Sequence, residues 1–181
     1  MREVLADLDT PLSAYLKLAA RPYSYLFESV EGGEKWGRYS IIGLPCRTLL
    51  RVHGNDITLE RDGSIIEHET AADPFDYIRR FKGRYRVPHI AHMPRFTGGL
   101  VGYFGYESVQ FIEPRVGALA KPDVIGAPDI LLLVSDEVVV FDSLAGKLYV
   151  IVHADPTIPD AFKGAEKRLD ELAARLTAAL F

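Results

Sequence analysis

The residues best placed to do chemistry are Glu28 and Ser29, which close an apolar stretch from residue 23 to residue 30. A carboxylate and a hydroxyl at the end of such a strand can hold a small zwitterion, because oxygen atoms accept from its ammonium while apolar side chains cover the rest. Strand alternation places Leu26 and Glu28 on one side and Phe27 and Ser29 on the other. The residue types alone also allow a simpler interpretation, in which Glu28 is solvated and Ser29 starts a turn.

Other catalytic or metal-binding patterns are weak in this sequence. No two histidines have the i, i+4 spacing of a helical zinc site, no G-x-S-x-G motif is present, and the single cysteine has no histidine beside it. We therefore predict that Cys46 is a small buried apolar residue. His89 and His92 share one loop, which leaves a metal site there as a less supported alternative. We predict no catalytic residue and no metal ligand in this chain.

A glycine-rich segment from Phe96 to Glu107 has four glycines among large apolar side chains. Its spacing is not G-x-G-x-x-G, and no Lys-Ser/Thr follows the glycines, so it is not a phosphate-binding loop. Glycines in an apolar strand indicate a turned backbone or a closely packed neighbour. We therefore predict a role in packing for this segment.

The elements that position these residues follow from caps, turns and periodicity. Thr10-Pro11 and Asp73-Pro74 each predict the start of a helix. A third helix is predicted near the end, where leucines recur at spacings of three and four and Thr157 or Asp160 is available as a cap. Ser135-Asp136 divides one apolar run into two strands. The remaining strands are predicted at residues 23–30, 36–42, 47–53, 56–61, 64–68 and 147–153. Hairpins dominate, so the predicted class is α+β with mostly antiparallel sheets.

Composition excludes several classes of protein. The chain has 181 residues, of which 48% are hydrophobic and 25% charged, with a net charge of −4. Neither a basic stripe nor a long apolar span is present, so we expect no nucleic-acid partner and no membrane span. The basic cluster at residues 79–86 suits the C-terminus of a helix. We expect a cytoplasmic protein with no internal disulfide. Leu180-Phe181 ends an apolar helix without a cap, which suggests a piece of a longer protein.

Three stretches in this order resemble one known family: residues 26–30 (Leu-Phe-Glu-Ser-Val), residues 36–43 (Trp-Gly-Arg-Tyr-Ser-Ile-Ile-Gly) and the glycine-rich segment. They are similar to the N-terminal domain of anthranilate synthase component I and of its sister, aminodeoxychorismate synthase component I. The opening at residues 10–15 also fits. The resemblance implies one domain over residues 1–181, built from sheets packed as a sandwich with flanking helices. It also implies that the C-terminal, chorismate-binding catalytic domain is absent from this chain.

The resemblance implies specific sites. The Leu-Phe-Glu-Ser element is similar to the family's L-L-E-S element, which binds feedback tryptophan, with Phe27 in place of the usual second leucine. The predicted tryptophan-binding residues are Leu26, Glu28, Ser29, Tyr39 and Ser40. In the family, the glycine-rich segment lies near the interface between domains. The resemblance therefore implies structural roles for Gly98, Gly99, Gly102 and Tyr103, and it places the hydroxyls of Tyr103 and Tyr106 at that interface.

Activity and partners are also implied by the resemblance. The whole enzyme would convert chorismate and glutamine or ammonia into anthranilate and pyruvate with magnesium, whereas this chain alone would be inactive and without a cofactor. Its partners would be L-tryptophan, the missing catalytic domain and a glutamine amidotransferase subunit. Two alternatives remain: the folate branch, through aminodeoxychorismate synthase, and a stand-alone binding module. A hydrolase using Cys46 or a histidine has the least support.

Overall fold

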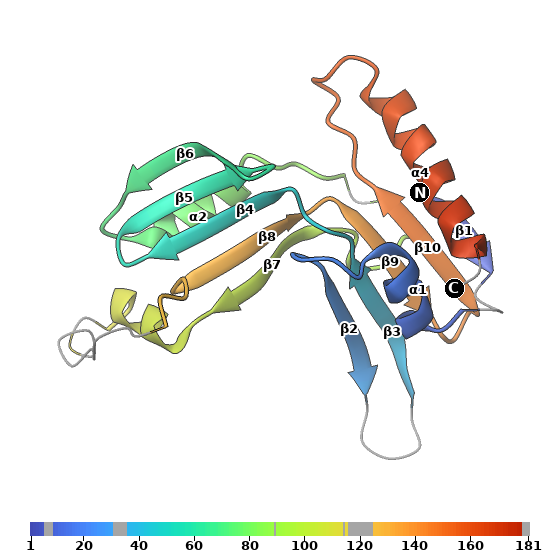
Figure 1. Ribbon diagram of the computed structural model, residues 1–181, viewed down its shortest axis with the longest axis horizontal. Coiled ribbons are helices and arrows are strands. Elements are labelled where there is room, and N and C mark those ends of the chain that lie inside the picture. The colour runs from blue at the N-terminus through green and yellow to red at the C-terminus, as the bar shows by residue number, and fades with distance from the viewer. Residues whose placement is uncertain (6–8, 31–35, 89, 114, 116–124, 179–181) are drawn as a thin grey trace. The chain divides into compact units, whose positions relative to one another are not determined.

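The computed structural model describes the chain except residues 6–8, 31–35, 89, 114, 116–124 and 179–181. The chain forms two compact units. Unit 1 comprises Met1–Cys46, Met93–Gly99 and Ser135–Phe181, and unit 2 comprises Arg47–His92 and Leu100–Val134. Each unit is built on a five-stranded sheet (Figure 1). The predicted α+β class with antiparallel sheets is confirmed, while the packing of the sheets as a sandwich and the single domain remain predictions.

Unit 1 holds the strands β1, β2, β3, β9 and β10 in the order β1-β10-β9-β3-β2. Its elements are β1 (Arg2–Leu5), α1 (Pro11–Leu18), β2 (Tyr25–Val30), β3 (Trp36–Gly43), β9 (Glu137–Asp142), β10 (Lys147–Val152) and α4 (Ala161–Thr177). Both helices pack on one face of this sheet, where Ala14, Ile42, Phe141, Val150 and Leu172 contribute to the core. Among the described residues, β2 is the strand at one edge of this sheet and has a neighbouring strand, β3, on one side of its backbone only.

The ends of the unit 1 helices test the predicted caps. Thr10 caps α1 as predicted, because its side chain accepts a hydrogen bond from the Ser13 amide at 3.1 Å and Ser13 Oγ accepts from the Thr10 amide at 2.9 Å. Asp160 does precede α4, but its φ is 56° and its side chain makes no capping hydrogen bond. The sequence did not predict β1, which pairs with β10 from Arg2↔Val150 to Leu5↔Lys147.

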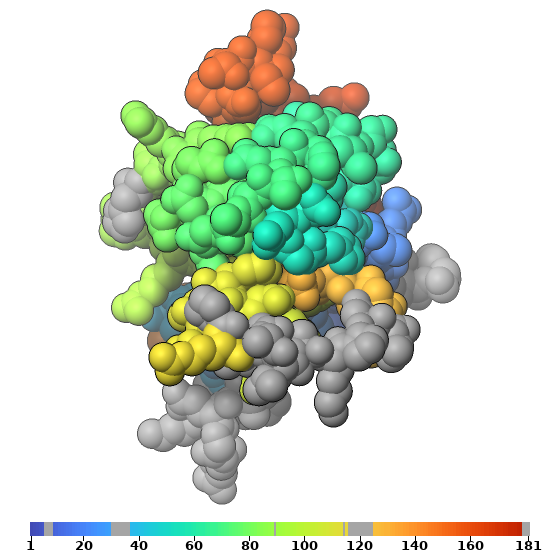
Figure 2. Space-filling model, turned by 90° about the vertical axis from the view of Figure 1, so that its left-hand side faces the viewer, coloured from blue at the N-terminus to red at the C-terminus, as the bar shows by residue number. Residues whose placement is uncertain are grey.

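Unit 2 holds β4 (Thr48–His53), β5 (Asp56–Arg61), β6 (Ser64–Thr70), β7 (Gly99–Phe104) and β8 (Ile130–Ser135), in the order β6-β5-β4-β8-β7. Helix α2 (Pro74–Lys82) packs on one face, where Tyr77 and Phe81 are buried with apolar side chains of β4, β5 and β8. Asp73 caps α2 as predicted, since its carboxylate accepts from the Phe75 amide at 2.9 Å. A short 3-10 helix, η1 (Tyr106–Phe111), follows β7 and lies at the surface (Figure 2, yellow).

The glycine-rich segment forms β7, and its neighbours are close. A Cβ atom on Gly102 would overlap the carbonyl oxygen of Leu131 on β8. Gly98 has φ of 143°, and a Cβ atom there would lie 2.5 Å from the Ser135 carbonyl oxygen and 2.9 Å from His153 Nε2. Both positions therefore need glycine for close approach of the backbone, which is the packing that the sequence predicted.

None of the helices in the described part of the chain is long and apolar enough to cross a membrane.

Candidate functional site

The predicted ligand-binding residues lie on the hairpin of β2 and β3. Glu28 pairs with Ser40, and Leu26 pairs with Ile42, across the two strands. Ile42 belongs to the core under the helices, and Leu26 packs against that core. Side chains two residues apart share a face of a sheet, so Leu26, Glu28 and Ser40 lie on the helix-covered face. Ser40 is buried there, whereas Glu28 is exposed.

Tyr39 lies on the opposite face of the same sheet. It packs beside Ile41 against Val138, Val140 and Ile151. The structure therefore brings together three of the five predicted residues on one face and leaves Tyr39 on the other. Tyr39 and Ser40 both lie on β3, between β9 and β2, whereas Leu26, Glu28 and Ser29 lie on the edge strand β2.

Ser29 occupies an irregular part of the hairpin. The pairing shifts in register between Glu28↔Ser40 and Val30↔Trp36. Ser29 is the single β2 residue between these two pairs, and it faces three residues of β3, from Gly37 to Tyr39. We call residues 37–39 the β3 bulge. A Cβ atom on Gly37 would overlap the carbonyl oxygen, Cβ and Oγ of Ser29, so the Ser29 side chain lies directly against the Gly37 backbone.

Arg38 and Asp142 form an ion pair that the sequence reasoning missed. Arg38 Nε and Nη2 donate to the two oxygens of Asp142 at 3.1 and 2.8 Å. Asp142 is only 3% exposed, and its Oδ1 also accepts from the amides of Leu144 and Ala145 at 3.2 Å each. The Arg38 guanidinium holds the pKa of Asp142 below its usual value of 3.8. The sequence does show an aspartate at the start of a turn after an apolar strand. This pattern predicts the two amide contacts, but it does not identify Arg38 as the partner of the carboxylate.

A second polar group of unit 1 joins Tyr25, Cys46 and Ser135. The Tyr25 hydroxyl and Ser135 Oγ are 2.8 Å apart. Burial raises the pKa of Tyr25 to about 12 and that of Cys46 to about 11. Cys46 is therefore a protonated, buried thiol at neutral pH, as its sequence context predicted, and it is poorly suited to act as a nucleophile.

Histidine and acidic residues offer no metal centre in the part of the chain that the structure describes, where no group of three or more His, Cys, Asp or Glu could hold an ion. His153 is used in packing, with Nε2 2.7 Å from the Thr97 carbonyl oxygen. His89, half of the alternative His89/His92 metal site, lies outside the described residues.

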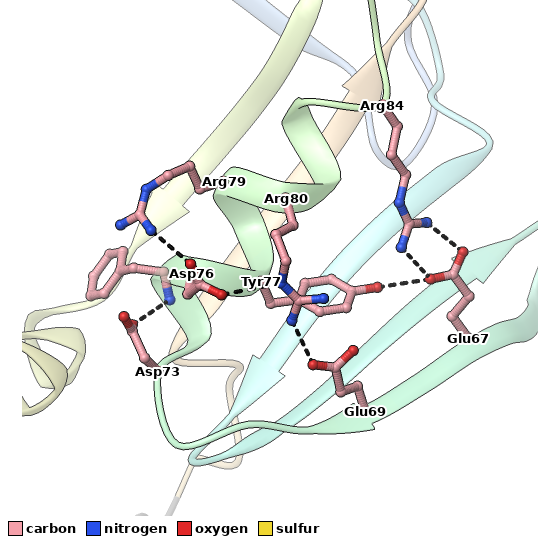
Figure 3. Close-up of polar contacts among 9 residues, drawn as sticks. Glu67, Glu69, Asp73, Asp76, Tyr77, Arg79, Arg80 and Arg84 are labelled. Atoms are coloured by element: carbon pink, nitrogen blue, oxygen red, sulfur yellow. Dashed lines mark hydrogen bonds and ion pairs between the residues drawn. The ribbon is translucent and has the colours of Figure 1, made fainter.

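Arg79, Arg80 and Arg84 of the basic cluster at residues 79–86 form ion pairs within unit 2 (Figure 3). Arg84 binds both oxygens of Glu67 at 2.6 and 2.9 Å, and Arg80 binds Glu69 at 2.7 Å. Glu67 also accepts from the Tyr77 hydroxyl at 3.1 Å. These arginines therefore join α2 to β6, and the interpretation of this segment as a helix C-terminus with structural cations is confirmed.

Glu67 predicts a small acid sensitivity of unit 2. Arg84, and secondarily the Tyr77 hydroxyl, lower the pKa of Glu67 below 4.5. The stabilisation is therefore fully present above pH 4.5 and is lost as the pH falls through the lower, folded-state pKa. Both partners are partly exposed, so we expect a contribution of only about 0.5 kcal/mol. Urea unfolding of the wild type and of Glu67→Gln between pH 6 and pH 3 should converge at the acid end; a constant difference across that range would contradict this prediction.

Comparison with known proteins gives a consistent result. No protein-family model matches the chain. The chain is 58% identical over 174 residues to anthranilate synthase component 1 of Pseudomonas aeruginosa, covering 96% of this chain and 35% of that protein. It is 50% identical over 179 residues to the protein of the same name from Neisseria meningitidis, covering 97% of this chain and 36% of the relative. The chain thus spans about a third of the length of these curated relatives.

A solved structure supports the fold. The crystal structure of anthranilate synthase component I from Streptococcus pneumoniae matches 99% of this chain and 38% of that chain, with a TM-score of 0.59 and 21% identity. The chain is therefore homologous over nearly its whole length to the N-terminal region of anthranilate synthase component I.

Proposed function

We propose that this chain is the regulatory part of an anthranilate synthase component I and that its β2–β3 hairpin binds feedback tryptophan. The observation that carries the proposal is the placement of Glu28 and Ser29 on the edge strand β2, with Ser40 opposite Glu28 on β3, in a chain homologous to that enzyme. The whole enzyme would act in tryptophan biosynthesis, forming anthranilate and pyruvate from chorismate and glutamine or ammonia. We assign catalysis and magnesium to the remaining two thirds of the protein.

The hairpin offers the groups that an aromatic amino acid needs. The exposed carboxylate of Glu28 attracts an ammonium group, and Ser29 Oγ can accept a hydrogen bond from it. Phe27 is 52% exposed, and its ring lies 4.9 Å from that of Tyr25. This aromatic pair provides apolar surface for an indole ring near the same edge. The contacts with the ammonium would fix the orientation of the ligand, and the ring contacts would favour tryptophan over smaller residues.

The homology also supports a protein partner, a glutamine amidotransferase subunit, together with the catalytic part of the enzyme. Unit 2 has exposed apolar side chains beside η1, where Tyr106 is 84% and Ile112 is 73% exposed. Exposed apolar surface of this kind favours a chain with protein partners over a stand-alone binding module. The Tyr103 hydroxyl instead donates to the Pro128 carbonyl oxygen at 2.9 Å, within unit 2.

Isothermal titration of L-tryptophan into the chain tests the ligand, with L-phenylalanine as the competing amino acid. We expect selective binding of tryptophan and a loss of affinity of at least about 10-fold in Ser29→Ala, because a hydrogen bond to a charged group contributes roughly 1.5–3 kcal/mol. Ser64→Ala, at an exposed strand end in unit 2, is the matched control and should bind like the wild type. Equal affinity in Ser29→Ala, or equal binding of phenylalanine, would contradict the proposal.

A further inference from the structure

We propose that the Arg38–Asp142 ion pair and Gly37 are positioning elements for Ser29. They would set ligand affinity without touching the ligand. The ligand half of this inference rests on the proposed function, whereas the positioning half concerns the hairpin itself. Three observations carry it: the register shift, the anchoring of the β3 bulge to β9, and the contact of Ser29 with Gly37.

The β3 bulge is the part of the hairpin that regular pairing does not define. On both sides of it, β2 and β3 residues pair one to one, but between those pairs one residue of β2 faces three residues of β3. A two-residue excess can be placed in several ways along a hairpin, and each would turn Ser29 differently. Some contact outside the β2–β3 ladder must therefore select the observed arrangement.

Arg38 supplies that contact through β9, the neighbour of β3 on its other side. Its carbonyl oxygen accepts from the Ser143 amide at 2.9 Å, and its guanidinium binds both oxygens of Asp142. Asp142 is in turn fixed by two backbone amides of the following turn. The middle residue of the β3 bulge is thus held at both its backbone and its side chain by one short segment of unit 1.

Contact with Gly37 makes the position of Ser29 depend on the position of the β3 bulge. Because the Ser29 side chain lies where a Cβ atom of residue 37 would be, Ser29 and the β3 bulge cannot move independently. The position of the Ser29 hydroxyl therefore depends on where Arg38 is anchored. The third residue of the bulge is Tyr39. Arg38 Cζ lies 4.8 Å from the centre of the Tyr39 ring, so the ion pair that fixes the guanidinium also restrains Tyr39.

The experiment compares two ion pairs of unit 1 that have the same geometry. Asp142→Asn and Arg38→Gln break the Arg38–Asp142 pair. Glu137→Gln breaks the control pair with Arg168, which also has two hydrogen bonds, at 2.8 Å each, and also involves β9. The ligand-free readout is the pair of backbone amide resonances of Ser29 and Gly37. The second readout is the dissociation constant for L-tryptophan.

We expect both pair-breaking variants to shift the Ser29 and Gly37 resonances and to weaken tryptophan binding at least 10-fold, while Glu137→Gln leaves both readouts unchanged. If Asp142→Asn loses the dispersed resonances of unit 1, Arg38→Gln decides, because it leaves the two backbone contacts of Asp142 in place. Unshifted Ser29 and Gly37 resonances, or equal shifts in Glu137→Gln, would overturn the positioning role. If the two variants shift these resonances but the wild-type chain binds no tryptophan, the positioning role is supported, and the ligand-affinity half is overturned together with the proposed function.

Discussion

Replacing Gly102 by alanine is expected to lower the free energy of unfolding by about 3 kcal/mol, because overpacking of this kind costs roughly 1–3 kcal/mol and the obstacle here is main chain. The new Cβ atom would overlap the Leu131 carbonyl oxygen and lie 3.0 Å from Leu132 Cα. Neither atom can move without separating β7 from β8. Relief by a side-chain rotation, the usual remedy for overpacking, is therefore not available at this position.

Urea unfolding followed by circular dichroism measures this loss, and hydrogen exchange of β7 and β8 amides locates it. Gly164→Ala is the control, since a Cβ atom on that residue of α4 meets nothing within 4 Å. Alanine there should increase stability by roughly 0.5–1 kcal/mol, through helix propensity alone. A Gly102→Ala variant that is as stable as the wild type, with unchanged exchange in β7, would show that the strand does not need this glycine.

Replacing Leu172 by alanine is expected to destabilise unit 1 by about 2–5 kcal/mol, the range for removing a buried leucine side chain. Leu172 is 0% exposed and lies in the core between α4 and the sheet, beside Leu169 and Leu176. The loss has two parts. The removed side chain no longer contributes buried apolar surface, and its removal creates a cavity between α4 and the sheet that the helix can close only in part. Because α4 is held mainly by this stripe, the effect should be among the largest of any single substitution in unit 1.

The matched control is Phe162→Ala in the first turn of the same helix, where the side chain is 71% exposed. Its removal should change the unfolding free energy by less than about 0.5 kcal/mol, as is usual at the surface. Thermal unfolding of both variants by circular dichroism tests the pair. Similar losses in Leu172→Ala and Phe162→Ala would mean that burial does not determine how α4 is held.

The proposed ligand site and the stability of unit 1 are separable. Ser29 and Glu28 are exposed on the edge strand β2, whereas the core under α1 and α4 is built from apolar side chains on the covered face. Substitutions at the two exposed residues should therefore alter binding with little loss of stability. Asp142 differs, since it is buried beside the hairpin and connects the two. This contrast is why a ligand-free structural readout is needed for its role.

Several features of this protein were determined by the sequence because their causes are local. Thr10 and Asp73 cap helices through hydrogen bonds to residues two or three positions away. The leucine spacing of α4 and the break at residues 135–136 depend on periodicity within one segment. The glycine-rich segment carried its need for close packing in its own composition. These patterns require no knowledge of what lies across the fold.

Other features depended on contacts between distant segments, which only the tertiary structure decided. β1 has little strand character of its own and exists because β10 pairs with it. Arg38 and Asp142 are 104 residues apart, so no local pattern could join them. The register shift at Ser29 and the face taken by Tyr39 depend on how β3 lies between two neighbours. Pairing between strands is a choice among many registers of similar local energy, and it is settled by the packing and charge partners that the whole fold supplies.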